Sequence, residues 1–178
     1  MGSISTAADN LKEIIGSVQL TGVRLRELTA AGSVPEAGVR TASVEIGHSA
    51  RVKDRSDDRF VVTAAIRVRV MEQGGGKQAL RRRPTTLSLL AAFDLLYDLP
   101  KAKDFAAADL SRFANVNGVY NAWPYWRELV QSITVRMGLP PIVLPVFRIP
   151  RRERNGRLNE RSANIRHRKL RGSVAPEQ

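Results

Sequence analysis

A strict two-residue alternation of apolar side chains in three segments most constrains the fold of this chain. Residues 41–52, 59–71 and 85–97 each place their apolar side chains at every second position. Because successive side chains of a β-strand point to opposite faces, this pattern predicts three strands that each bury one face. Residues 18–28 are predicted as a fourth, weaker strand. It is interrupted at Gly22, where the apolar parity shifts as a β-bulge would require.

Helical patterns lie before and after these strands. Residues 6–17 have apolar side chains at helical spacing, Asp104 is placed to cap a short helix through about Phe113, and residues 124–137 form a longer amphipathic helix with Pro124 as its first residue. The short polar links between the strands favour an antiparallel meander over parallel pairing. The sequence therefore predicts an α+β fold, a four-stranded antiparallel meander with helices packed on one face.

The charge of the chain is divided unevenly. The 178 residues carry 29 Lys and Arg against 17 Asp and Glu, a net charge of +12. Residues 148–178 hold 10 of the basic and 3 of the acidic side chains, with few aliphatic ones. Such a segment buries too little apolar surface to offset its ordering entropy and is predicted to be a disordered basic tail. We expect three parts, an N-terminal segment with a short helix at 1–17, one domain at 18–147, and this tail.

The candidate chemical groups do not form an active site. The chain has no Cys, and of its two His only His48 lies outside the tail, on the predicted core side of its strand. No Ser lies in a nucleophile elbow, and no spacing suits a metal. We therefore predict a protein that is not an enzyme and that uses no cofactor. Residues 1–10 have neither the basic start nor the apolar centre of a signal peptide, so a cytoplasmic protein without membrane insertion is expected.

The second faces of the third and fourth predicted strands are not fully polar. Five apolar residues interrupt them: Val61, Ala65, Leu90, Ala92 and Leu96. Scattered surface apolar residues are one explanation. The alternative, which we favour, is that part of this face is covered by another subunit or by a partner. The predicted oligomer or partner face consists of Val61, Ala65, Leu90 and Leu96.

One stretch of sequence identifies a family resemblance. Trp-Pro-Tyr-Trp-Arg-Glu at 123–128 opens the long helix, Gly-Leu-Pro-Pro follows at 138–141, and Leu-Pro-Val at 144–146. This arrangement resembles the SecB family of protein-export chaperones and SecB-like domains, and the resemblance covers about residues 18–147. It implies a sheet with helices on one side, assembly into a homodimer or tetramer, and ATP-independent binding of non-native polypeptide in an apolar groove. The client could be an exported protein or a dedicated one such as an antitoxin.

The resemblance also implies which side chains line that groove. We predict polypeptide binding by an aromatic and aliphatic set: Phe93, Tyr97, Trp123, Tyr125, Trp126, Leu139, Ile142 and Leu144. Aromatic side chains provide a large contact area and lose little rotamer entropy when they bind. The alternative is that Trp123, Tyr125 and Trp126 seal the helix against the sheet.

Two features depart from the family pattern. A basic segment from Arg148 replaces the second long helix that usually follows the crossover. Export chaperones of this family use acidic residues on the outer sheet to bind the SecA motor, whereas the corresponding strand here has Arg59, Thr63, Arg67 and Arg69. These residues argue against docking to SecA. The basic tail also leaves an alternative function open, a module that associates with nucleic acid through salt-sensitive phosphate contacts.

Overall fold

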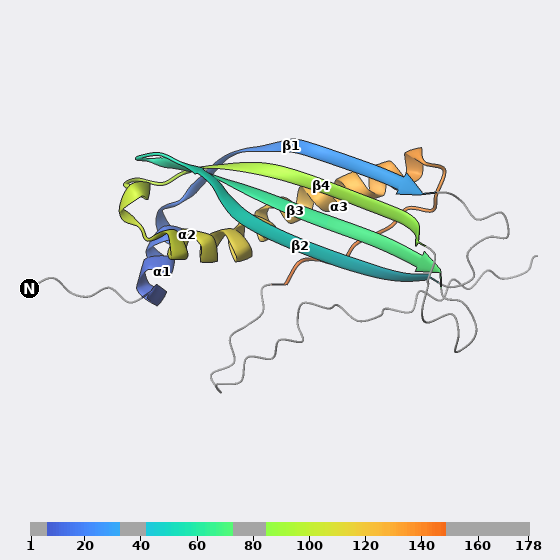
Figure 1. Cartoon of the computed structure of the whole chain (residues 1–178), viewed down its shortest axis with the longest axis horizontal. Coiled ribbons are helices and arrows are strands. Elements are labelled where there is room, and N and C mark those ends of the chain that lie inside the picture. The colour runs from blue at the N-terminus through green and yellow to red at the C-terminus, as the bar shows by residue number, and fades with distance from the viewer. Residues whose placement is uncertain (1–6, 33–41, 73–84, 149–178) are drawn as a thin grey trace, which may run out of the picture.

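The computed structural model describes residues 7–32, 42–72 and 85–148 (Figure 1). Along the chain its elements are α1 (Ala7–Ser17), β1 (Gln19–Gly32), β2 (Ala42–Arg55), β3 (Arg59–Glu72), β4 (Thr85–Asp98), the 3-10 turn η2 (Ala102–Asp104), α2 (Ala107–Phe113), the π-helical segment η3 (Ala114–Gly118) and α3 (Val119–Arg136). Residues 139–148 then continue without helix or strand, and we call them the crossover segment. The predicted tail, apart from Arg148, lies outside the described residues.

The four strands form one antiparallel sheet in the order β1-β4-β3-β2. The predicted α+β class and antiparallel sheet are confirmed, but the simple meander is wrong for β1. Strands β2, β3 and β4 follow one another across the sheet, whereas β1 pairs with β4 and not with β2. The physical reason lies in β4, whose inner face is apolar throughout and whose outer face also carries Leu90, Ala92 and Leu96. These apolar side chains are better covered in a central strand than at an edge.

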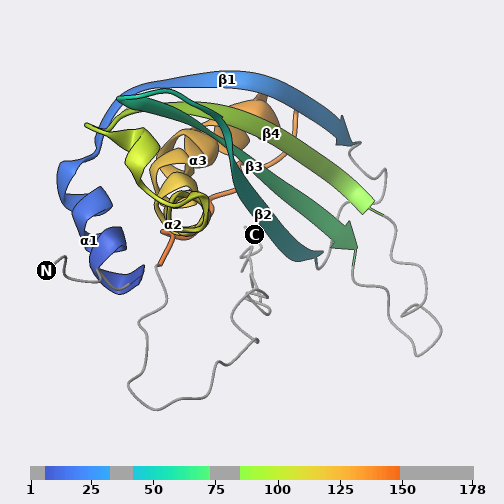
Figure 2. The same cartoon turned by 60° about the vertical axis from the view of Figure 1, so that its left-hand side comes forward.

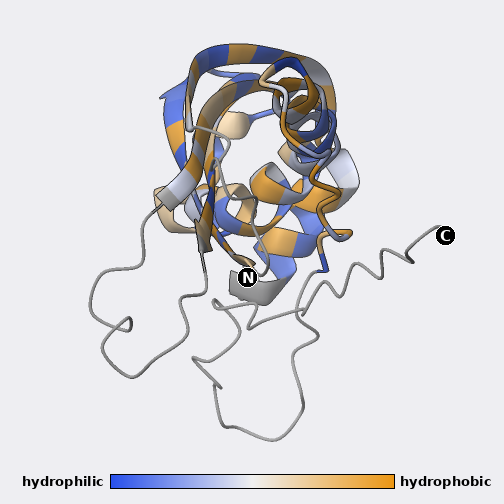
Figure 3. Cartoon of the chain, turned by 90° about the vertical axis from the view of Figure 1, so that its right-hand side faces the viewer, coloured by the Kyte–Doolittle hydropathy of each residue, from blue (hydrophilic) through white to orange (hydrophobic). Residues whose placement is uncertain are grey.

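Helices cover one face of the sheet, which we call the inner face (Figure 2). The alternating residues of β3 and β4 predicted to be apolar on one side are buried there: Phe60, Val62, Ala64, Ile66 and Val68, and Leu87, Leu89, Ala91, Phe93, Leu95 and Tyr97. The hydropathy colouring alternates between hydrophobic and hydrophilic along the strands (Figure 3). The alternation in the sequence therefore identified the buried face correctly.

Three aromatic rings join the sheet to the helices at one end of the core. The rings of Phe60 and Tyr97 stack with centroids 5.0 Å apart, and Phe113 of α2 meets them edge-on at 5.6 and 5.1 Å. Burial raises the pKa of Tyr97 to about 12, and a hydrogen bond from Asn121 opposes this shift. Asn121 Nδ2 donates that bond to the Tyr97 hydroxyl at 2.9 Å, so the buried phenol has a polar partner.

The helical half differs from the predicted boundaries in two places. Asp104 lies in η2 and does not cap α2, whose N-terminal boundary residue is Ala106 with no side-chain cap. Pro124 lies inside α3, which begins at Val119. Pro124 removes a backbone donor for the carbonyl of Tyr120, but both residues are exposed, so water can satisfy that carbonyl. An exposed carbonyl thus makes an internal proline tolerable where the sequence suggested a helix start.

Gly118 marks a tight approach of the helical layer to the sheet. A Cβ atom at this position would lie 2.8 Å from Cγ1 of the buried Val62, whereas one at Gly16 of α1 would meet no atom within 4 Å. We expect Gly118→Ala to lower the free energy of unfolding by about 1–2 kcal/mol, because overpacking outweighs the better helix propensity of Ala.

The matched control is Gly16→Ala, expected to be neutral or to stabilise by up to about 1 kcal/mol through helix propensity alone. Urea unfolding followed by circular dichroism measures both. Equal effects of the two substitutions would show that the close approach at Gly118 is unimportant.

Candidate functional site

The crossover segment is held to α3 by side-chain hydrogen bonds. Trp123 Nε1 donates to the carbonyl of Pro145 at 2.8 Å, and Arg127 Nε donates to the carbonyl of Leu144 at 2.9 Å. Both donors lie on one side of α3, since four residues is about one helical turn. These bonds satisfy carbonyls of a segment that has no strand partner, and they bring Leu144 to 2% exposure.

Phe147 connects the end of the crossover segment to the sheet. Its ring lies 5.1 Å from that of Trp123 and meets His48 of β2 edge-on at 5.4 Å. Desolvation by partial burial lowers the pKa of His48 from its ordinary value of 6.5. The crossover segment therefore runs from the end of α3 back to β2, as Figure 1 also shows.

Most of the predicted polypeptide-binding side chains are buried in this conformation. Five of them belong to the core, with exposures of 4% or less: Phe93, Tyr97, Trp123, Trp126 and Leu144. Leu139 and Ile142 are half-buried, and Tyr125 is 48% exposed. The five buried residues cannot contact a client in this arrangement, and the alternative of sealing the helix against the sheet describes Trp123 and Trp126. Of the aromatic residues in the set, Tyr125 alone is available to a ligand.

Two exposed leucines on β1 were missed by the sequence-based prediction. Leu25 is 50% and Leu28 38% exposed, and they pair with Phe93 and Ala91, so both lie on the inner face. Leu25 and Leu28 are three residues apart and would point to opposite faces of a regular strand. They share a face because a second register shift, between Leu25 and Glu27, adds one residue to β1. The apolar residues at this uneven spacing are the available signal, and the sequence prediction includes only the first shift, at Gly22.

Tyr125 lies on the side of α3 away from the crossover segment. It follows Trp123 by two residues, which is about 200° around the helix, so it points away from the crossover segment and from β2. This is the side of the inner face to which β1 belongs. We group Leu25, Leu28 and Tyr125, three accessible apolar side chains on this side, as the β1–α3 surface. Val143 and Val146 of the crossover segment are 70% and 67% exposed and lie apart from it.

The predicted oligomer or partner residues lie on the opposite, outer face of the sheet. Val61 pairs with Leu96, Ala65 with Ala92, and Arg67 with Leu90. Val61, Ala65, Leu90 and Leu96 are half-buried, and Ala92 is 7% exposed. What covers this face in an assembly stays a prediction.

Asp94 is the most enclosed charge of that outer face. Thr63 donates to its Oδ1 at 2.7 Å, Lys53 Nζ lies 2.8 Å from its Oδ2, and Arg26 lies 3.8 Å away. Desolvation raises the pKa of Asp94, but the hydrogen bonds from Lys53 and Thr63 and the charges of Lys53 and Arg26 outweigh it, so the pKa is lowered. The carboxylate therefore remains ionised and fixes two cations on the sheet.

No cluster of metal-ligating side chains occurs within 7–32, 42–72 and 85–148, and no helix in these ranges is long and apolar enough to cross a membrane. Neither a family model nor a curated protein sequence matches this chain. Among solved structures, a SecB-like chaperone from Mycobacterium tuberculosis matches with a TM-score of 0.65 and 22% identity, covering 80% of this chain and 99% of that chain.

The fold of this chain is SecB-like, as its helix and crossover motif predicted. The mycobacterial SecB-like chaperone was solved in complex with a ChAD peptide from the HigA1 antitoxin. A protein of unknown function from Streptococcus agalactiae matches with a TM-score of 0.37 and 9% identity over 72% of this chain and 96% of that chain, which is too weak for any inference.

The two tryptophans of the SecB-like helix differ in their hydrogen bonding. Trp126 Nε1 is buried with no partner among the described residues, whereas Trp123 Nε1 binds Pro145. We expect Trp123→Phe to cost about 1 kcal/mol more stability than Trp126→Phe, because only the former loses a hydrogen bond, and the latter removes an unsatisfied donor. Urea unfolding followed by far-ultraviolet circular dichroism compares them. A larger loss for Trp126→Phe would contradict the assignment.

His48 makes the stability of this arrangement depend on pH. Its pKa is lowered in the folded chain, so the unfolded state binds a proton more readily below the ordinary value of 6.5. The folded chain therefore has its full stability above pH 6.5, where His48 is neutral in both states. Part of that stability is lost as the pH falls and the unfolded state takes up the proton. We expect acidification from about pH 7.5 to about pH 5.5 to destabilise the wild type more than His48→Gln, in thermal unfolding at each pH. An NMR titration that places the pKa of His48 above 6.5 would reverse the sign.

Proposed function

We propose that this protein is an ATP-independent chaperone that binds a segment of non-native polypeptide on the β1–α3 surface. The observation that supports it is the pair of exposed leucines on the inner face of β1. Leu25 and Leu28 are 50% and 38% exposed beside the buried Phe93 and Ala91. An apolar surface open to solvent next to the core is suited to covering an exposed apolar stretch of another chain.

We propose an extended segment as the ligand of this surface. β1 contributes two leucines along one strand, and α3 contributes Tyr125 from the helical layer. Tyrosine combines a large apolar ring with a polar tip and few rotatable bonds, so it can adapt to different segments at a small entropic cost. Client binding then requires no movement of the five buried residues that the sequence suggested, which continue to stabilise the core.

We further propose a dedicated client. The solved mycobacterial SecB-like chaperone was captured with a peptide from an antitoxin, and the fold similarity to this chain supports an analogous client here. The outer face of β3 has Arg67 and Arg69, both exposed, where the export chaperones of the family are acidic. This difference supports a client-specific role over general delivery to SecA. A homo-oligomer remains our expectation for the assembled protein.

Suppression of aggregation tests the proposal. We expect the wild-type protein, without nucleotide, to reduce light scattering of a chemically denatured client diluted into buffer. The double substitution Leu25→Ser with Leu28→Ser should raise the amount needed by about tenfold, because it removes most of the accessible apolar area contributed by β1. The matched control is Ile15→Ser, since Ile15 of α1 is 48% exposed and lies outside the β1–α3 surface.

Each result has a definite meaning. No suppression by folded wild-type protein at a stoichiometric ratio would refute chaperone function. Suppression that the leucine variant and the Ile15 variant retain equally would refute the β1–α3 surface as the binding site. The alternative of a nucleic-acid module depends on residues 148–178, of which only Arg148 is described, and remains a prediction from the sequence.

A further inference from the structure

We propose that the outer face of the sheet binds an acidic polypeptide segment, separately from the apolar β1–α3 surface. Seven basic side chains from three strands occupy this face: Arg24 and Arg26 of β1, Arg51 and Lys53 of β2, and Arg59, Arg67 and Arg69 of β3. Five acidic side chains share it, Glu27, Glu45, Asp54, Asp94 and Asp98. The face therefore carries a net positive charge.

The cations on this face are of two kinds. Lys53 and Arg26 are bound to Asp94, at 2.8 and 3.8 Å, and Arg59 is bound to Asp98 at 3.0 Å. In contrast, Arg24, Arg51, Arg67 and Arg69 are exposed and make no ion pair with any residue in the described parts of the chain. Their guanidinium groups are available to carboxylates, which they can bind through two parallel hydrogen bonds.

The strand register spaces these free arginines across the sheet. Arg51 pairs with Thr63, Thr63 with Asp94, and Asp94 with Arg24, so the two edge arginines lie in one row about 14 Å apart. Arg67 and Arg69 are two residues apart on β3, which is about 7 Å along the strand. Carboxylates at every second position of an extended segment have this same repeat of about 7 Å.

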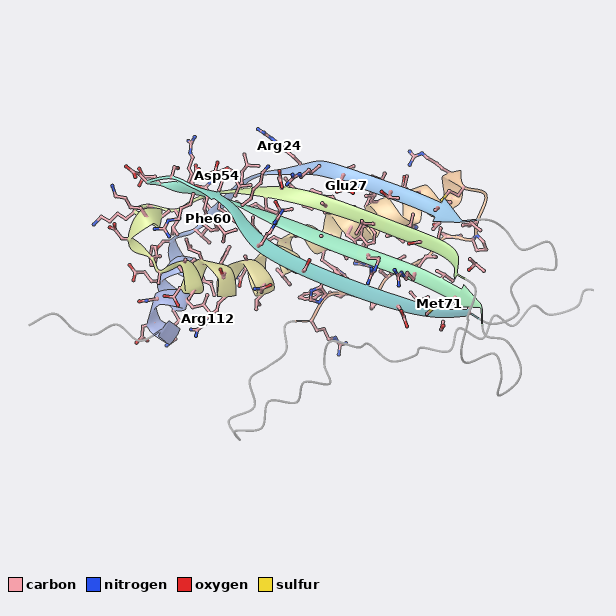
Figure 4. All side chains as sticks on the ribbon, viewed as in Figure 1. Arg24, Glu27, Asp54, Phe60, Met71 and Arg112 are labelled. Carbon is pink, nitrogen blue, oxygen red and sulfur yellow. The ribbon has the colours of Figure 1, made fainter. Side chains whose placement is uncertain are left out.

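Small apolar residues form the floor between the arginines. Ala65 and Ala92 are paired across β3 and β4, with Leu90 beside them, and all three are at least half-buried. A flat floor of this kind allows a polypeptide backbone to approach closely while its acidic side chains reach the surrounding arginines. Figure 4 shows Arg24 projecting outward from β1, whereas Arg112 belongs to α2 on the helical side of the sheet.

Charge disfavours a second copy of this chain as a partner in a face-to-face arrangement. Such contact would place seven cations against seven, with five acidic side chains on each side, and the net positive charges of the two faces would repel each other. The apolar residues at Val61, Ala65, Leu90 and Leu96 are therefore better explained by a partner of opposite charge than by self-association through this face.

Nucleic acid fits this face less well than an acidic polypeptide does. No aromatic side chain among the described residues lies on the outer face, so bases would have nothing to stack on. Glu27, Glu45 and Asp94 are interspersed with the arginines and would repel a continuous phosphate backbone, whereas a polypeptide can place its carboxylates selectively.

Fluorescence anisotropy of the full chain tests the proposal. The probe is a fluorescein-labelled peptide of about twelve residues that alternates Glu with Ala, and the control peptide alternates Gln with Ala. Arg51→Gln, Arg67→Gln and Arg69→Gln are combined in one variant. The matched control combines Lys12→Gln, Arg112→Gln and Arg136→Gln, which remove the same charge from the helices. Both variants keep residues 148–178, so the basic tail contributes equally.

We expect the outer-face variant to bind the acidic peptide at least about tenfold more weakly than wild type, while the helix variant changes less than about twofold. Replacing the same three arginines with Lys keeps the charge and should retain most of the affinity for the acidic peptide. This variant also serves as the control that the sheet tolerates substitution at these positions. Equal losses in the two Gln variants, or no binding of the acidic peptide by wild type, would overturn the proposal.

A labelled oligothymidine of about twenty nucleotides is the second probe. We expect the affinity for this oligothymidine to fall no more in the outer-face variant than in the helix variant. A selective loss of oligothymidine binding in the outer-face variant would identify a nucleic-acid surface and overturn the proposal. Aggregation suppression does not depend on these arginines, so failure here leaves the proposed chaperone function standing.

Discussion

The need to bury the inner faces of β3 and β4 governs the rest of the structure. The inner faces of these central strands carry eleven of the buried apolar residues, and the continuous helical stretch of α2, η3 and α3 covers them. The approach is close enough at Gly118 and Val62 that a single methyl group would not fit. The helical layer therefore has little freedom to move over the sheet, and its position decides which other surfaces remain open.

The crossover segment completes this cover on one side of α3 only. Trp123 and Arg127 bind its carbonyls, and Phe147 carries it to His48 of β2. Nothing comparable among the described residues covers Leu25 and Leu28 of β1, which stay exposed. The crossover segment covers the core on the β2 side of α3, and an apolar surface remains exposed on the β1 side. The proposed client site follows from that asymmetry.

The two sides of the sheet offer different physical interactions. The β1–α3 surface is apolar, so its contacts with a ligand are strengthened by excluded salts and depend on the area covered. The outer face carries free arginines around a small apolar floor, and its contacts are weakened by salt screening. The two proposed ligands would therefore bind opposite sides of one sheet without competing with each other.

The sequence by itself determined the strands, their buried face, the helical regions and the SecB-like fold, because alternation, helical spacing and the Trp-Pro-Tyr-Trp-Arg-Glu motif are local properties of the chain. It could not show that β1 pairs with β4, since pairing partners depend on which strand most needs cover on both faces. It also could not separate Trp123 and Trp126, which are buried, from Tyr125, which is exposed, because all three lie within four residues.

That separation depends on where the crossover segment returns, and so does the exposure of Leu25 and Leu28, which a β-bulge brings to the same face. Exposure is a property of the packed layers and not of residue type. The tertiary structure alone decided it.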